Sequence, residues 1–177
     1  MKKVIINIAL IFSFIIVYIL QANLFSWFKI VGVMPNLFVI YVLFIGLYAH
    51  KYMGVTYGVI FGLLIDLFIS KKVGITAIML GVVGIIGAVF DKNFSKENRI
   101  TLIIMVAIST AIFEIGSYIL GYFVYNTYVL VWQFLQILLI ECFYNMMLTI
   151  IFYPLMQVLG NKIEDVYKGD RILTRYF

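Results

Sequence analysis

The sequence predicts an all-α integral membrane protein, a bundle of about six transmembrane helices. Of its 177 residues, 65% are hydrophobic and 12% are charged, and the mean hydropathy is +1.13. A soluble domain is about 45–50% apolar, so this chain carries more apolar surface than a water-facing fold can bury. The apolar residues form continuous runs of about 20, the length of a membrane-spanning helix, rather than the alternating pattern of a transmembrane β-barrel.

Short polar linkers divide the chain into six expected spans, at roughly 4–24, 31–49, 53–70, 74–91, 100–124 and 130–159. The first span follows Lys2 and Lys3, as in a signal peptide. Its apolar stretch is too long for one, however, and no small-x-small cleavage site follows, so we expect the span to be retained. Residues 1–160 are expected to form a single transmembrane domain, and 161–177 a short cytoplasmic tail.

Two of these spans depart from a regular transmembrane helix. The second contains Pro35, and because proline suits the first turn of a helix, we expect the helix to begin near Met34 or Pro35. About 15 residues then remain, or ~22 Å, which is short of the ~30 Å hydrocarbon core. Residues 30–34 are therefore expected to be non-helical chain covered by protein or water. The last span is about 30 residues long and is expected to tilt, bend or project from the membrane.

The basic residues predict the orientation of the chain, because cytoplasmic loops are enriched in Lys and Arg. With the N-terminus inside, the inner segments hold Lys2, Lys3, Lys51, Lys92, Lys96, Arg99, Lys162, Lys168, Arg171 and Arg175. The outer segments then hold only Lys29, Lys71 and Lys72. The same orientation places an aromatic belt at the outer interface, made of Trp27, Tyr125, Tyr128 and Trp132. Both termini are expected to be cytoplasmic, and the scattered charges, +5 in total, argue against nucleic-acid binding.

A stripe of small residues marks the third span, where Gly54, Gly58, Gly62 and Asp66 recur at a spacing of four. Residues i and i+4 lie on one helix face, and rows of small residues let two helices approach closely in lipid. The stripe is therefore expected to dock a helix. The docked helix could belong to the same chain or to another subunit. Alternatively, a ligand could approach the bare backbone of the stripe. An internal candidate lies in the fourth span, with its own small face of Gly81, Gly84 and Gly87.

Three acids, Asp66, Glu114 and Glu141, lie inside expected spans, and no Lys or Arg does. Intramembrane acids are costly and mark functional sites by default. We expect a polar cluster of Asp66, Glu114, Glu141 and Asn145 in the outer half of the membrane. The acids could be neutral and hydrogen-bonded, could line a water-filled cavity open to the outside, or could meet polar or basic groups of a partner protein. Candidates for internal hydrogen bonds are Asn145, Tyr118 and Ser117.

The sequence gives little support to catalysis or to metal binding. Cys142 is the only cysteine and lies in an apolar run, and His50 is the only histidine. Neither has a second ligand or a catalytic partner at a suitable spacing, and no phosphate-binding loop is present. The protein is therefore expected not to be an enzyme and to need no cofactor or metal.

The order of these motifs resembles the family of the rod shape-determining protein MreD. That family typically has Pro-Asp-Leu at the start of the second helix, followed by a glycine-rich third span that ends in an Asp, and then a further Gly. The corresponding positions here are Pro35, Asn36, Leu37, Gly54, Gly58, Gly62, Asp66 and Gly74. Asn36 departs from the Asp of the family pattern, so no role that requires a charge is expected at this position.

The resemblance implies a non-enzymatic membrane scaffold of the bacterial cell elongation machinery, involved in rod cell-shape determination. Such a protein lies in the cell (inner) membrane and binds MreC. It thereby links cytoplasmic MreB filaments to the peptidoglycan synthase formed by RodA and its transpeptidase. The family is also similar in fold to the substrate-binding subunits of energy-coupling-factor transporters.

That similarity implies an alternative function, a vitamin-binding transporter subunit whose acids line an outward cavity. Such subunits usually carry an Ala-x-x-x-Ala motif in the first helix, and the nearest match here is Ala9 and Ser13 in an otherwise bulky helix. This difference favours the scaffold. A flippase or lipid-precursor channel is a third class, but the spans lack the cations that would hold a pyrophosphate.

Overall fold

A computed structural model describes residues 2–49, 51–68, 73–94, 98–126 and 130–168. Within these residues the chain is helical, apart from short connections and one β-bridge between Ile30 and Val33. The helices are α1 (Lys2–Ile19), the π-helical turn η1 (Leu20–Leu24), α2 (Phe25–Trp27), α3 (Leu37–Tyr48), α4 (Lys51–Phe68), α5 (Ile75–Asn93), α6 (Arg99–Tyr125) and α7 (Val131–Tyr167).

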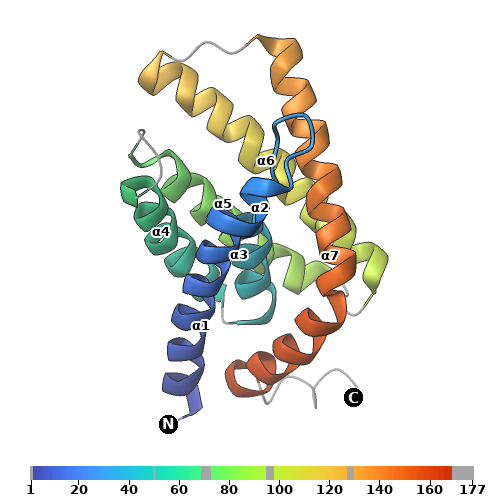
Figure 1. Cartoon of the computed structure of the whole chain (residues 1–177). Coiled ribbons are helices and arrows are strands. Elements are labelled where there is room, and N and C mark those ends of the chain that lie inside the picture. Colours follow the sequence, from blue (N-terminus) through green and yellow to red (C-terminus); the bar gives the residue numbers. More distant parts are fainter. Residues whose placement is uncertain (1, 50, 69–72, 95–97, 127–129, 169–177) are drawn as a thin grey trace.

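These helices confirm the expected fold class. α1, η1 and α2 form one continuous helical stretch, so the described chain has six such stretches, and each overlaps a different expected span (Figure 1). Four are long and apolar enough to cross a membrane: Lys2–Trp27, Ile75–Asn93, Arg99–Tyr125 and Val131–Tyr167. The remaining two, α3 and α4, are apolar but shorter.

α3 lies at the centre of the bundle, and eleven of its twelve residues are buried. It packs against α1, α4, α5, α6 and α7, which surround it in Figure 1. The helix begins at Leu37, slightly later than the sequence predicts, because Asn36 caps it by accepting a hydrogen bond from the Val39 amide at 3.3 Å. The expected non-helical approach before it includes a tight turn at Val31 and Gly32, both with positive φ angles.

α7 is the longest helix, with 37 residues, and contains Pro154. Proline lacks a backbone N–H and clashes with the preceding turn, which bends a helix. Figure 1 shows that the red C-terminal part of α7 runs in a different direction from the orange part before it. The helix continues to Tyr167, so seven residues expected in the tail are helical, and 169–177 lie outside the described residues.

The start of α1 and the end of α7 meet at one end of the bundle (Figure 1). The Tyr167 hydroxyl lies 2.6 Å from Asn7 Oδ1 and 3.3 Å from the Lys3 carbonyl oxygen. The Lys3 ammonium group lies 5.8 Å from the centre of the Tyr167 ring. The two ends of the described chain therefore lie on the same side of the bundle.

Candidate functional site

The segment Pro35–Leu37, which carries the family-like motif, is held by side chains from two other helices. Gln21, in the π-helical turn, donates from Nε2 to the Pro35 carbonyl at 2.7 Å and accepts at Oε1 from the Leu37 amide at 3.1 Å. From α7, Asn145 Oδ1 accepts a hydrogen bond from the Asn36 amide at 2.8 Å. Backbone groups just before a helix would otherwise be unsatisfied in an apolar interior, so these side chains make the late start of α3 possible.

Asn145 also joins α7 to α6. Its Nδ2 donates to Thr110 Oγ1 at 2.9 Å, and the hydroxyl of Thr149 donates to the Asn145 carbonyl at 2.7 Å. All three side chains are fully buried. The amide of Asn145 thus connects α6, α7 and the start of α3 at one point.

Glu114 and Glu141 lie one helical turn from Thr110 and Asn145 on the same two helices. Their carboxyl groups lie close to each other, and Glu141 also lies close to the Asn36 side chain. Glu141 is buried and Glu114 is half-buried. Carboxyl groups in an apolar interior are costly, which marks this pair as a candidate polar site.

Asp66 belongs to α4, and its side chain lies at the start of α5 rather than in this cluster. Its Oδ2 accepts hydrogen bonds from the Gly74 amide at 2.8 Å and the Ala77 amide at 3.2 Å. The fully buried carboxylate therefore caps the N-terminus of α5, where a negative charge is favourable. Gly74 precedes the helix with φ of +102°, a conformation that suits glycine. The structure places Glu114, Glu141 and Asn145 near one another, and places Asp66 with Gly74.

The glycine stripe lies against α5 of the same chain. A methyl group added at Gly58 would overlap the Leu80 carbonyl, and one at Gly62 would overlap the backbone of Ala77. At the N-terminal end of the stripe, Gly54 faces Gly84 of α5 and Gly46 of α3. Of the occupants that the sequence left open, an internal helix is therefore the one found on this face. A helix from another subunit could lie there only if α4 and α5 separated.

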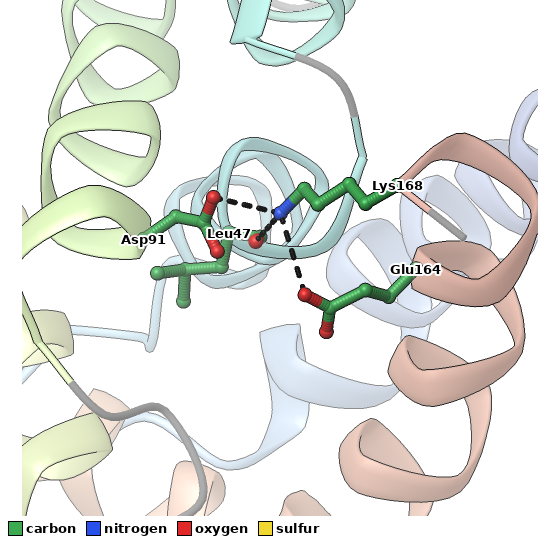
Figure 2. A network of polar contacts seen from close by, with 4 residues as sticks. All are labelled: Leu47, Asp91, Glu164 and Lys168. Carbon is green, nitrogen blue, oxygen red and sulfur yellow. Dashed lines mark hydrogen bonds and ion pairs between the residues drawn. The ribbon is translucent and has the colours of Figure 1, made fainter. Parts of the chain in front are cut away.

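Sequence reasoning missed several polar residues that hold the helices together. Gln21, Thr110 and Thr149 are buried. Gln21 could have been found from the sequence, because a polar amide side chain is unusual within an apolar span. Lys168 was assigned to the tail, yet its ammonium group joins three helices (Figure 2). Gly46, the glycine of α3 that meets α4 and α5, was not singled out because it forms no regularly spaced row with other small residues.

The remaining sequence expectations concern metals and reactive groups. In the described part of the chain, no group of three or more His, Cys, Asp and Glu residues could hold a metal ion. Cys142 is half-buried, with its Sγ 3.7 Å from the Ala107 carbonyl oxygen. His50, Lys71, Lys72 and Tyr128 lie outside the described residues.

The fold and this site define a polytopic α-helical membrane protein in which buried polar side chains join the helices to one another. Comparison with protein families narrows the class further. The model of the family described as rod shape-determining protein MreD matches residues 2–163 of the chain, which belongs to this family. The protein is thus a membrane protein of rod-shape determination, and its family is one of structural shape-determination proteins.

Searches of curated proteins and of solved structures found no match to the chain. The expected similarity to the substrate-binding subunits of energy-coupling-factor transporters therefore stays a prediction. Family membership and the apolar helices establish a multi-pass membrane protein associated with the shape-determination complex.

Proposed function

We propose that the protein is a scaffold of the bacterial elongation machinery that binds an MreC-like membrane protein. Through this partner it connects MreB filaments to the peptidoglycan synthase made of RodA and its transpeptidase. The observation that carries the proposal is the family match over residues 2–163. The packing of the motif residues supports it, because Pro35, Asn36 and Asp66 all take part in contacts between helices.

We propose that the protein lies in the cell (inner) membrane with both ends in the cytoplasm. The distribution of basic residues supports this orientation through the positive-inside rule. The contact of Tyr167 with Asn7 is consistent with an even number of crossings. Trp27 and Trp132, which then lie at the outer interface, are 90% and 69% exposed, as expected of side chains in an aromatic belt.

The partner contact is proposed at the outer end of α4 and α5. The glycine stripe contributes to it by holding the two helices together and so fixing the cap between Asp66 and Gly74. Next to this cap, large apolar side chains are exposed: Leu67, Phe68 and Val73. Exposed apolar side chains at the ends of two packed helices suit packing against the transmembrane helix of a partner, or against the chain just outside it.

Co-purification of the MreC-like partner with variants of the full-length protein tests this site. Phe68→Ala is expected to reduce recovery of the partner several-fold, because it removes a large exposed side chain without disturbing the buried contacts. Phe12→Ala is the matched control, since Phe12 is also an exposed phenylalanine, 64% against 73%, but belongs to another helix, α1. Equal recovery with both variants, at normal levels in the membrane, contradicts the proposed contact.

The transporter alternative draws on one observation at the carboxyl pair. In the described part of the structure, Glu141 Oε1 and Ser117 Oγ are buried without a hydrogen-bond partner. Buried polar atoms of this kind can be satisfied by water or by a polar ligand. Mass spectrometry of the protein after mild extraction tests this possibility, and a vitamin that co-purifies with the wild type but not with Glu141→Leu would favour the transporter subunit over the scaffold.

A further inference from the structure

α3 contacts α7 on both sides of the bend at Pro154. Before the bend, Asn145 Oδ1 accepts the hydrogen bond from the Asn36 amide, at the start of α3. After the bend, Gly160 lies against the ring of Tyr48, at the end of α3, where an added methyl group would come within 2.5 Å of the ring carbons. The short central helix thus spans the bend and touches both arms of α7.

The end of the bent segment is held by Lys168, the residue that follows α7. Its Nζ lies 2.8 Å from Asp91 Oδ2 of α5, 2.8 Å from the Leu47 carbonyl oxygen of α3, and 3.8 Å from Glu164 Oε1 of α7. Figure 2 shows the ammonium group between these three oxygens. The Lys168 side chain is only 10% exposed and that of Asp91 20%, so the contact is well shielded from water. Such a charge-assisted contact is stronger than an exposed surface pair.

The packing of the segment between Pro154 and Lys168 is one-sided. Its buried residues follow helical spacing along the face towards the bundle: Met156, Gly160 and Ile163. The opposite face carries exposed apolar residues: Leu155, Val158 and Leu159. Because Pro154 removes one backbone hydrogen bond of the helix, the angle between the two arms is soft unless contacts elsewhere fix it.

We propose that α7 is a hinged helix in which Pro154 is the hinge, the segment 155–167 is a movable arm, and Lys168 is the latch that locks the arm in its bent position. Hinges commonly lie at a few positions that absorb a backbone change while the packed parts move as rigid units. The latch stabilises the bent form over a straighter one, because Asp91 and Leu47 reach Lys168 only when the arm is bent. This inference concerns the conformation of the chain itself and does not depend on the proposed partner.

Distance measurements between spin labels on the full-length protein in lipid nanodiscs test the latch. One label is placed at Val158→Cys on the arm and the other at Ile85→Cys on α5, both at exposed positions, in a Cys142→Ser background. The parent is expected to give one narrow distance distribution. Lys168→Met is expected to raise the population of a second distance about tenfold, which corresponds to about 1.4 kcal/mol.

Two further substitutions separate the latch from general effects of charge. Lys162→Met removes an exposed lysine from the same arm and is expected to leave the distribution unchanged. Lys168→Arg keeps the charge and the donors, and is expected to retain the single distance. A Lys168→Met distribution identical to that of the parent overturns the proposal, as does an equal change in Lys162→Met.

If Lys168→Met does not accumulate as a folded protein, Asp91→Asn decides the question. It weakens the ion pair but keeps the hydrogen bond from Lys168 to Leu47, so the second population is expected to rise by a smaller factor. No rise overturns the latch. Adding Pro154→Leu to the more affected variant tests the hinge, because restoring the backbone hydrogen bond is expected to narrow the distribution again. An unchanged distribution shows that the arm does not turn at Pro154.

Discussion

Two neighbouring helix pairs of this bundle are joined in opposite ways. α4 and α5 meet backbone to backbone, through the glycines of the stripe and their counterparts on α5. α6 and α7 meet through polar side chains, with Thr110 bonded to Asn145 and Glu114 beside Glu141. In lipid, where apolar burial alone does not favour helix association, both solutions work. The contact between α4 and α5 is sensitive to added atoms, and the contact between α6 and α7 is sensitive to the loss of a polar partner.

The largest effect is expected at the glycine contact. Gly58→Ala places a methyl group on the Leu80 carbonyl, which cannot move without shifting α5, so we expect a loss of ~3 kcal/mol or more of unfolding free energy. Gly81→Ala is the matched control, because its methyl group meets only the Val59 side chain. Unfolding in mixed micelles measures both, and equal losses would show that the backbone contact is not what limits this pair.

A smaller effect is expected where the polar contact loses a partner. Asn145→Leu leaves the Asn36 amide without its acceptor and the Thr110 hydroxyl without its amide neighbour, at a cost of ~2 kcal/mol. Asn23→Leu is the comparison, because the Asn23 amide is exposed and bonds only within its own helix. The same unfolding assay is used, and a loss below that of Asn23→Leu would contradict the assigned role of Asn145.

At the cap of α5 we expect a loss of ~1 kcal/mol for Asp66→Leu, which leaves the amides of Gly74 and Ala77 without an acceptor. Asp66→Asn keeps one acceptor oxygen and is expected to lose less. Hydrogen exchange of the two amides measures the effect locally. Exchange that stays slow in Asp66→Leu would mean that the carboxylate does not protect them.

The smallest effect is expected for Thr149→Val. The Thr149 hydroxyl donates to the carbonyl four residues earlier, and its loss is expected to cost ~0.5 kcal/mol, the typical size of a hydrogen bond inside a membrane protein. Thr56 makes the same bond to Tyr52 from an exposed position, so Thr56→Val is expected to cost less. A larger loss of unfolding free energy for Thr56→Val than for Thr149→Val would show that burial does not strengthen this hydrogen bond.

The spans could be predicted from the sequence because a helix must be apolar over a fixed length to cross a bilayer. The ends of the helices were harder, since they depend on local capping. α3 starts at Leu37 because Asn36 accepts the Val39 amide, and α7 continues to Tyr167 despite the polar residues that follow Asn161. The spacing of the glycines likewise predicted a docking face but could not identify the helix that fills it.

The positions of the polar residues in the bundle were harder to predict. Glu114, Glu141, Asn145 and Asp66 were grouped because each is costly in an apolar span, but that criterion does not distinguish Asp66, which caps another helix. Gln21 and Lys168 each donate to a backbone carbonyl, 14 and 121 residues away respectively. Such contacts depend on how helices are arranged in space, and no pattern along the chain encodes them.

The short length of α3 also has a consequence for how the protein enters the membrane. A helix of twelve residues is ~18 Å long, well short of the hydrocarbon core. Backbone groups at its start bond to the side chains of Gln21 and Asn145, and a backbone carbonyl at its end bonds to Lys168. Two of these three side chains belong to the last part of the chain to be synthesised. α3 is therefore expected to settle into its final place only after α7 has been inserted, so the innermost helix is among the last to be completed.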